Sequence, residues 1–300
     1  VQVNWQYQQL EYVSQLKYTN HAGEVLAQFD ASYDRTGHRR SLTINPTGET
    51  FNYEYTPAYA LSREVRQLNG ATTDTSYTYD RVGNRLTRGV AGAGTESYSY
   101  NARYELTRIA HIGGGATELS YDLNGNTLNK VFSGSQSAPA ERMDYGWDQL
   151  NRMTGAVRSV DGVPVAAASF NYAGAGWEAA SQTVNGETRE FSWGYGGELL
   201  GESIPNVGTR NYVNAGLDHV LWSVDAPPGV PSGAARVWLT DISGSVFGIT
   251  DALGSVTERQ RYDAFGNTQV TDAAGAPVAQ SVIGNRLGFH GRTAIPEVGL

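Results

Sequence analysis

Aspartate is the residue type that could most readily do chemistry in this sequence, because it recurs at one position of a repeated pattern. Asp34, Asp80, Asp122, Asp148 and Asp263 each follow an aromatic residue. Recurrent carboxylates could act in pairs as general acid and base, or hold Ca²⁺. The tandem calcium pattern G-G-x-G-x-D is absent. A structural role explains the pattern better, because an aspartate at a turn entry accepts hydrogen bonds from the backbone that follows it.

The other chemically active residue types are scattered along the chain. Its five histidines include no i, i+4 pair and no acidic set at metal-ligand spacing. Ser255 lies in LGSV, not in a G-x-S-x-G frame, and cysteine is absent. The glycines at 113–115 lack the Lys-Ser/Thr and helix of a phosphate loop. We therefore predict no catalytic, cofactor-binding or metal site, and no cofactor. The histidines are His21, His38, His111, His219 and His290.

The stretch YTYDRVGNRLTR, which begins at Tyr77, shows the element that positions each aspartate. Its two leading tyrosines are two residues apart, so they share one face of an extended strand. Asp80 then enters a turn, where Gly83 and Asn84 can adopt positive φ at low energy. The letters RLT resume a second strand that returns against the first. The stretch therefore predicts a β-hairpin.

An aromatic residue before the turn marks each repeat, and these marks are 19 to 26 residues apart. This spacing allows two short strands and two connections per repeat. Even Glu54 to Leu68, the segment nearest to helical periodicity, contains Pro57 and is predicted to be strand. The sequence predicts an all-β fold of hairpin repeats. The aromatic marks are Tyr7, Tyr33, Tyr55, Tyr79, Tyr100, Tyr121, Trp147, Tyr172, Trp193, Tyr212, Trp238 and Tyr262; the repeat positions that keep the template best are Tyr33, Asp34, Tyr79, Asp80, Gly83, Tyr121, Asp122, Gly125, Trp147, Tyr262, Asp263 and Gly266.

The composition argues against nucleic acid as a partner and against a membrane-spanning segment. The net charge is -8 and Lys17 and Lys130 are the only lysines, which argues against a nucleic-acid partner. No apolar run approaches the roughly 20 residues that span a bilayer, so we expect no membrane span. The proline-rich segment Asp225 to Ala235 cannot pair as a central strand and is predicted to be an excursion or a boundary.

After Trp238 the signals become denser, with TDISGSVFGITDALGSV, RYDAFGN, GFHGR and PEVGL in succession. The repeats resemble the YD repeats of the RHS and teneurin group. This last stretch resembles the start of the RHS repeat-associated core. The resemblance divides the chain into YD/RHS repeats at 1–235 and a truncated core start at 236–300. The core signature residues are Phe289, Gly291, Arg292, Glu297 and Gly299.

The resemblance implies a continuous spiral sheet that forms part of a shell, or cocoon, wall, as in toxin-complex proteins. Its implied function is to enclose and deliver a C-terminal toxin segment absent from this chain, with secretion or toxin-complex components as further partners. This function implies a bacterial protein, and we expect it to be secreted or exposed at the cell surface. We expect 300 residues not to close a shell, because the family's cocoons are much longer. We also expect no enzyme in this chain, because the family's aspartyl autoprotease would need residues after Leu300.

Two alternatives stay open. The chain could be an extracellular adhesin or glycan-binding surface protein, with glycans as partners, or a glycan-acting enzyme on a β-repeat scaffold. Aromatic side chains buried in the sheet favour the shell, whereas a solvent-facing aromatic groove favours glycan binding. Two carboxylates about 5 to 9 Å apart in a cleft would favour the enzyme.

Overall fold

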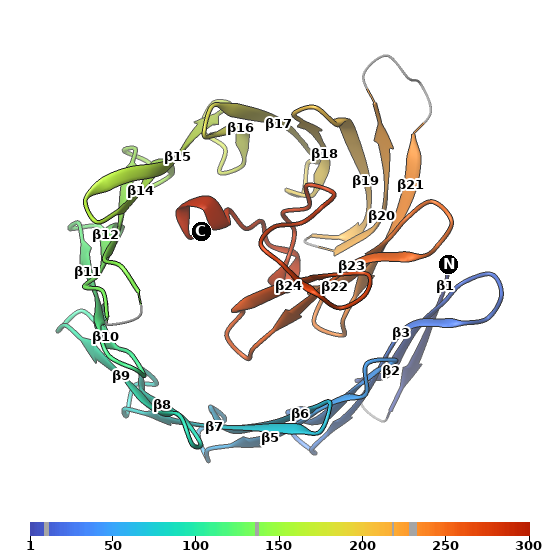
Figure 1. Ribbon diagram of the computed structural model, residues 1–300, viewed down its shortest axis with the longest axis horizontal. Helices are drawn as coiled ribbons and strands as arrows, with labels where there is room; N and C mark the ends of the chain where they lie inside the picture. Colours follow the sequence, from blue (N-terminus) through green and yellow to red (C-terminus); the bar gives the residue numbers. More distant parts are fainter. Residues whose placement is uncertain (9–11, 136–137, 218, 228–232) are drawn as a thin grey trace. The chain divides into compact units, whose positions relative to one another are not determined.

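The computed structural model describes residues 1–8, 12–135, 138–217, 219–227 and 233–300. In this part of the chain the regular elements are β-strands and two short 3-10 helices, and there is no α-helix. Each hydrogen-bonded strand pair is antiparallel and joins strands that are consecutive in the chain (Figure 1). The all-β fold of successive hairpins is therefore confirmed.

The chain forms two compact units, which are described separately. The first unit contains residues 1–31, 43–47 and 171–295, and the second contains residues 32–42, 48–170 and 296–300. Three strands have residues in both units: β3 (Val25–Tyr33), β4 (Arg39–Asn45) and β15 (Val163–Tyr172). The predicted boundary between residues 235 and 236 divides the chain by repeat type and stays a prediction.

The second unit is a run of hairpins in which each strand from β5 to β13 pairs with the next strand in sequence. A 3-10 helix, η3 (Pro296–Val298), packs against its last strand. The strands are β5 (Glu49–Tyr55), β6 (Leu61–Leu68), β7 (Ala71–Tyr79), β8 (Arg85–Val90), β9 (Gly94–Tyr100), β10 (Leu106–Ala110), β11 (Ala116–Tyr121), β12 (Thr127–Phe132), β13 (Glu141–Trp147) and β14 (Met153–Val160).

The first unit contains the remaining strands and the helix η2 (Phe289–Gly291). Its described pairings again follow chain order, β1 to β3 and β16 to β25. These strands are β1 (Gln2–Tyr7), β2 (Val13–Thr19), β16 (Ala179–Val184), β17 (Glu187–Trp193), β18 (Leu199–Ile204), β19 (Gly208–Gly216), β20 (His219–Ala226), β21 (Ala234–Thr240), β22 (Val246–Thr250), β23 (Val256–Tyr262), β24 (Thr268–Asp272) and β25 (Pro277–Val278).

The first unit has a conventional hydrophobic core. Trp238 of β21 packs edge-on against Tyr212 of β19, with ring centroids 5.6 Å apart. Phe29 of β3 meets Phe247 of β22 in the same geometry at 5.1 Å. The hydroxyl of Tyr18 is 3.0 Å from that of Thr240, which joins β2 to β21. These contacts bury side chains of two strand groups against each other, as in a layered β-protein.

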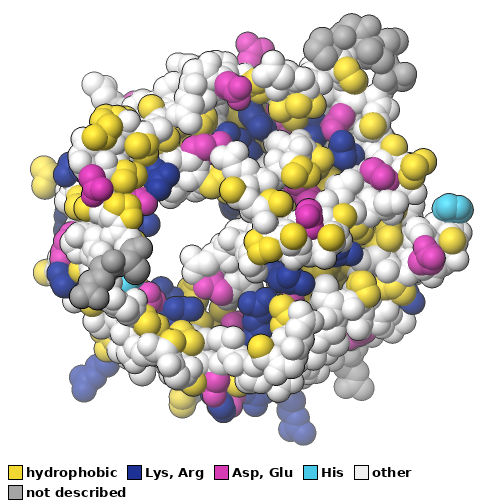
Figure 2. Space-filling model, in the orientation of Figure 1, with side chains coloured by type: hydrophobic (Ala, Val, Ile, Leu, Met, Phe, Trp, Pro, Cys, Tyr) yellow, Lys and Arg dark blue, Asp and Glu magenta, His cyan; other side chains and the backbone are white. Residues whose placement is uncertain are grey.

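Among the described residues, the second unit buries fewer hydrophobic side chains than the first unit. Successive side chains of its strands point to opposite faces of the sheet. Tyr77 and Tyr98 are its most buried tyrosines, and the guanidinium of Arg85 lies 4.3 Å from the ring centroid of Tyr98. Polar residues such as Glu49 and Thr75 share this buried face. On the face shown in Figure 2, acidic and basic side chains are interspersed with hydrophobic ones.

Local expectations mostly agree with the structure. Residues 54–68 form the end of β5, a turn and β6, as strand was predicted there. In the template hairpin only Gly83 has positive φ, at 94°, whereas Asn84 supplies its side chain to the turn instead. The segment Asp225 to Ala235 begins in β20 and ends in β21, and its residues 228–232 lie outside the described residues.

Candidate functional site

Each repeat aspartate accepts hydrogen bonds from the backbone of its own turn. Asp80 Oδ1 accepts hydrogen bonds from the backbone N–H groups of Val82 and Asn84, at 3.0 and 2.8 Å. Its Oδ2 accepts a third bond from Asn84 Nδ2 at 2.8 Å. This is the bonding that the turn-entry interpretation predicts. The same two backbone contacts recur at Asp34, Asp122, Asp148 and Asp263, and also at Asp241, Asp251 and Asp272.

The electrostatics of these aspartates follow from the turn. The hydroxyl of Thr36, aided by turn N–H groups, lowers the pKa of Asp34 to about 2. The side chain of Asn126 likewise lowers the pKa of Asp122. A carboxylate held ionised in this way is a poor general acid near neutral pH. Candidate Ser255 belongs to the same arrangement, because its backbone N–H donates to Asp251.

Seven of the twelve aromatic marks bond to the backbone carbonyl at the start of the preceding strand, whereas Tyr212 and Trp238 donate to the side chains of Glu202 and Ser223 on that strand. Tyr79, at the end of β7, donates its hydroxyl to the carbonyl of Leu61, at the start of β6, at 2.8 Å. Trp147 does the same with its indole N–H, donating to Thr127 at the start of β12. Tyr262 donates to Val246 at 2.7 Å. The same bond is made by Tyr55, Tyr100, Tyr121 and Trp193 to the carbonyls of Arg39, Arg85, Leu106 and Ala179.

We name this recurrent bond the aromatic–carbonyl tie. It was not anticipated from sequence. Partial burial raises the pKa of the Tyr79 and Tyr121 hydroxyls, so they remain neutral donors. The tie uses the polar end of the aromatic, while its ring is partly covered by the sheet. The seven tied marks among the described residues therefore do not present a free row of aromatic faces.

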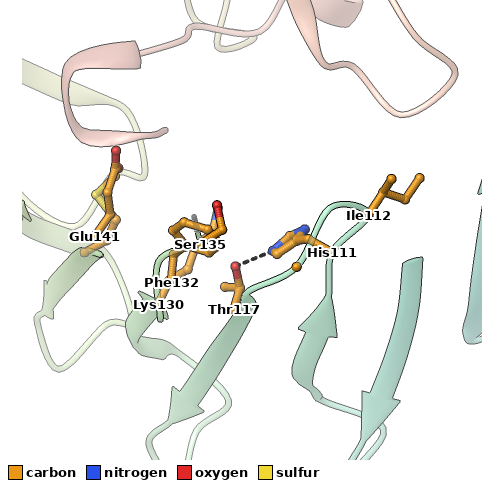
Figure 3. A pocket seen from close by; sticks show the side chains of 9 residues that line it. His111, Ile112, Thr117, Lys130, Phe132, Ser135 and Glu141 are labelled. Carbon is orange, nitrogen blue, oxygen red and sulfur yellow. Dashed lines mark hydrogen bonds between the residues drawn. The ribbon is translucent and has the colours of Figure 1, made fainter. Parts of the chain in front are cut away.

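A pocket of about 350 Å³ in the second unit brings polar side chains of neighbouring hairpins together (Figure 3). His111 turns toward Thr117 there, and its Nε2 lies 2.7 Å from the Thr117 hydroxyl. The other ring nitrogen, Nδ1, lies 3.2 Å from Glu96 Oε1. The remaining lining residues are Ile112, Gly114, Lys130, Phe132, Ser135, Glu141 and Met143.

Glu96, His111 and Thr117 have the connectivity of an acid, a base and a hydroxyl. Burial would raise the pKa of Glu96, but hydrogen bonds from His111 and Tyr98 outweigh it and the pKa is lowered. The ionised carboxylate therefore orients the imidazole. Thr117 is almost wholly buried at the second position of β11, where it is paired on both sides. The arrangement can fix the position of His111, and it lacks an exposed nucleophile.

Sequence reasoning did not group these three residues, since Glu96 precedes His111 by 15 positions. Strand order alone brings them together, because β9, β10 and β11 are neighbours. A search for polar residues at equivalent positions of adjacent hairpins would have found them. Glu141, the acidic residue among those lining the pocket, is paired with Arg158 at 2.8 Å.

The core signature residues fall into two local settings. In the first unit, Phe289 packs against Tyr262, with ring centroids 5.5 Å apart, and lies against Gly266. Gly291 has φ 70° and donates its N–H to Gly288. The backbone N–H of Arg292 donates to Phe289 and closes this short 3-10 turn. In the second unit, Glu297 lies in η3, and Gly299 lies against Met143.

A buried ionic cluster in the first unit was also missed. Arg210, fully buried on β19, donates to Asp225 through Nε at 2.6 Å and through Nη2 at 2.9 Å. Arg236 donates to the same carboxylate at 2.7 Å. These two guanidinium groups outweigh burial and lower the pKa of Asp225. Arg210 and Arg189 also donate to the carbonyls of Ile283 and Gly284, at 2.9 and 3.0 Å.

The histidines occupy separate settings, as their spacing suggested. His38 stacks on Tyr59 at 4.8 Å, and His290 Nδ1 lies 3.0 Å from the Ser243 carbonyl. Burial lowers the pKa of His219. Within the described ranges, no three His, Cys, Asp or Glu side chains are grouped to hold a metal ion. No helix in that same part of the chain is long and apolar enough to cross a membrane.

The chain is similar to nucleases named WapA. It is 25% identical over 247 residues to the tRNA3(Ser)-specific nuclease WapA of Bacillus spizizenii. It is 24% identical over 247 residues to the tRNA nuclease WapA of Bacillus subtilis strain 168. Each match covers 80% of this chain and only 9% of the relative. The chain thus corresponds to about a tenth of the length of either WapA protein.

The solved structures that are similar to this chain include TcdB2-TccC3 without its hypervariable C-terminal region. That match has a TM-score of 0.46 and 11% identity, and covers 96% of this chain and 21% of the other. The Photorhabdus luminescens Tc holotoxin pore matches with a TM-score of 0.36 and 13% identity, over 94% of this chain and 20% of the other. No protein-family model matches the chain.

Proposed function

We propose that this chain is a structural segment of an RHS-type toxin protein, in which it forms part of a shell that encloses and delivers a C-terminal toxin segment. One observation carries the proposal: the residues that recur are used by the hairpins themselves. The aspartates bond their own turns, and the aromatic marks bond the preceding strands. A repeat organised in this way builds an extended sheet.

The similarity to WapA supports a role in a toxin-associated protein. The matched region covers most of this chain but a small part of each nuclease. We infer that the similarity reflects a shared repeat scaffold, and that any nuclease activity would belong to another segment. The C-terminal toxin segment is then the main partner, and secretion or toxin-complex components are further partners. Secretion or display on a bacterial cell surface follows from this role.

The alternatives receive less support. Glycan binding predicts aromatic faces open to solvent in a groove, whereas seven of the aromatic marks are partly covered and their polar ends are tied to carbonyls. A glycan-acting enzyme predicts two facing carboxylates. Among the described residues that line the pocket, Glu141 is the one carboxylate, and it is held by Arg158.

Limited proteolysis of the complete natural gene product tests the proposal. The shell role predicts that its C-terminal segment resists protease while the repeats are folded, and becomes cleavable when denaturant unfolds them. The same segment expressed alone is the control and should be digested rapidly. Mass spectrometry identifies the protected fragments. Digestion of the segment at equal rates with and without the folded repeats would overturn the shell role.

A further inference from the structure

Five turns of the second unit lie along one edge of its sheet. The strands from β5 to β14 pair antiparallel in chain order, so successive turns alternate between the two edges (Figure 1). The turns that follow the odd-numbered strands are therefore all at the same edge. We name this edge the turn rim; it consists of residues 56–60, 80–84, 101–105, 122–126 and 148–152.

Two turns of the rim carry a tyrosine in a strained backbone position. In every turn the N–H of the fourth residue donates to the carbonyl of the first, and the fourth residue has positive φ. Gly83, Gly125 and Asn151 occupy this position in three turns. Tyr59 and Tyr104 occupy it in the other two, with φ of 66° and 63°. Glycine and asparagine adopt this left-handed conformation readily, whereas the side chain of a tyrosine makes it unfavourable.

Burial does not offset this strain, because both tyrosines are exposed. Tyr59 is 61% exposed and Tyr104 is 62% exposed. The other three turns each expose an aliphatic side chain, namely Val82, Leu123 and Leu150, and Leu123 is 93% exposed. An apolar side chain in water gains none of the free energy of burial. Strained residues of this kind are often found where a protein contacts a ligand.

The turns are held in fixed positions by hydrogen bonds from one turn to the next. Arg103 Nη1 donates to the carbonyl of Leu123 at 3.2 Å. Asn126 Nδ2 donates to Asn151 Oδ1 at 2.8 Å. These bonds join the last three turns of the rim. The exposed side chains of these turns are thus presented by an ordered edge, which lowers the entropy that binding would otherwise cost.

The spacing of the exposed side chains fits a lipid surface better than a protein surface. Neighbouring turns of the rim are two strands apart, which is about 10 Å. A stable protein interface needs a contiguous, closely packed apolar centre. Lipid acyl chains, in contrast, surround each inserted side chain separately. Tyrosine also favours the membrane interface, where its ring meets acyl chains and its hydroxyl meets the head groups.

The charges of the rim are balanced, which favours a zwitterionic lipid over an anionic one. Arg103 pairs with Glu105 at 3.0 Å, and Arg152 pairs with Asp148 at 2.7 Å. The five turns have no excess of basic residues that would draw them to anionic head groups. Their charged residues are Arg81, Arg103, Arg152, Asp80, Glu105, Asp122 and Asp148.

We propose that the turn rim is a membrane-docking edge, at which Tyr59, Tyr104 and the exposed aliphatic side chains between and beside them insert into the interface of a phosphatidylcholine bilayer. The sheet stays outside the bilayer, so this is peripheral binding without a membrane-spanning segment. The strained tyrosines, the exposed leucines and the bonds between turns have one explanation in this arrangement. The inference concerns the edge of the hairpins and does not depend on the shell role.

Asparagine at the two tyrosine positions separates lipid contact from folding. Asn151 occupies the equivalent position, so Tyr104→Asn should relieve strain and raise the folding equilibrium constant about threefold. Tyr59→Asn also removes a stacking contact with His38, which offsets part of the same gain. Flotation of the chain with phosphatidylcholine vesicles on a density gradient measures its partition coefficient. We expect the double variant to partition roughly tenfold more weakly without loss of stability.

Two further variants control for strain and for exposure. Leu123→Asn combined with Leu150→Asn leaves the tyrosine positions intact and should also weaken partition roughly tenfold. Val163→Asn is the matched control, because Val163 is 63% exposed and follows the connection between β14 and β15, at the opposite edge of the sheet. We expect Val163→Asn to leave the partition coefficient unchanged.

Failure of the unmodified chain to float with phosphatidylcholine vesicles would overturn the proposal. Equal partition of the tyrosine double variant and Val163→Asn would also overturn it, as would binding that needs anionic vesicles and disappears at high salt. Sedimentation detects pairing of two copies through the rim. A dimer that the tyrosine double variant dissociates, without lipid binding, would assign the rim to self-association instead. Proteolytic protection of a C-terminal segment tests the shell role separately.

Discussion

The tyrosine marks have two functions at the scale of a single residue. The ring occupies one face of the sheet, and the hydroxyl reaches the backbone carbonyl at the start of the preceding strand. Tryptophan can replace tyrosine at this position because its indole N–H is also a donor on an aromatic frame. Phenylalanine would keep the ring and lose the bond. The repeat therefore selects an aromatic donor at this position.

The first prediction concerns Tyr100→Phe, which removes the hydroxyl that donates to Arg85 at 2.9 Å. We expect the free energy of unfolding to fall by about 1 kcal/mol, because one partly buried hydrogen bond is lost and a carbonyl is left without its donor. Urea unfolding followed by circular dichroism measures the change. Tyr195→Phe is the matched control. Because Tyr195 is fully exposed, this substitution should leave the free energy of unfolding unchanged. Equal losses in the two variants would contradict the tie.

The second prediction is a pH dependence caused by the turn aspartates. The pKa of Asp34 is lowered to about 2 and that of Asp122 is lowered from its usual value of 3.8, so both bind protons less readily when folded. Their stabilising contribution is therefore present above about pH 4 and lost as the pH falls through the folded pKa. The unfolding midpoint should decrease between about pH 4 and pH 2. Replacing Asp122 by alanine should lower stability at pH 7 and flatten this decrease; an unchanged pH profile would exclude the contribution of Asp122.

The role of Asp122 could be predicted from sequence because its hydrogen-bond donors, Asn124 and Asn126, are its own near neighbours. The tie of Tyr121 could not, since Leu106 lies 15 residues away and its position depends on the register of two hairpins. The same reason hid the contact between His111 and Glu96. Local chemistry is readable from the chain, whereas contacts between repeats require the register of the sheet.

At the scale of elements, the buried cluster around Arg210 fastens a C-terminal segment to the strands of the first unit. Arg210 joins β19 to β20 through Asp225 and reaches the carbonyl of Ile283. Glu258 on β23 holds the same segment, accepting hydrogen bonds from the Ser281 hydroxyl and the Val282 N–H. Residues 281–284 are thus positioned by charged groups on the strands beneath them.

The third prediction is that Arg210→Met lowers the free energy of unfolding by about 3 to 5 kcal/mol, because it leaves Glu202 and Asp225 buried with fewer partners. Hydrogen exchange should also increase at residues 281–284, which lose a donor to Ile283. The control Arg142→Met removes an exposed pair with Asp144 and should change stability by less than about 1 kcal/mol. Similar losses in both variants would show that the cluster is not a specific anchor.

This cluster shows where strand patterns mislead. Arg210 shares the buried face of β19 with Tyr212, which is two residues away, although an arginine is rarely fully buried. It is buried because Asp225 and Glu202 lie on the two neighbouring strands. Opposite charges one strand away in each direction, at register-matched positions, are the signal that a sequence search could use.

At the scale of the whole chain, the two-strand repeat is the unit of construction. Each strand of the second unit pairs with its sequence neighbours, and each tie spans a single strand pair. Stability of such a protein is a sum of repeat and nearest-neighbour terms, so a complete repeat can be removed without destroying its neighbours. Removal of a single strand is different, because it reverses the direction of every strand that follows.

The fourth prediction uses this difference. Deleting residues 80–100 removes one turn, β8, a connection and β9, and joins Tyr79 to Asn101, which begins an equivalent turn. Strand β10 then follows β7 in the same direction as β8 did, and the tie from Tyr121 to Leu106 is retained. We expect a folded β-protein that unfolds cooperatively at a lower denaturant concentration, as judged by circular dichroism. Deleting residues 80–90 removes the turn and β8 but keeps β9. To keep its former direction β9 would have to pair parallel with β7, which its short connection does not permit. This variant should aggregate or lose its β signal. If both deletions fold equally well, or if neither folds, the hairpin is not the independent unit from which this chain is built.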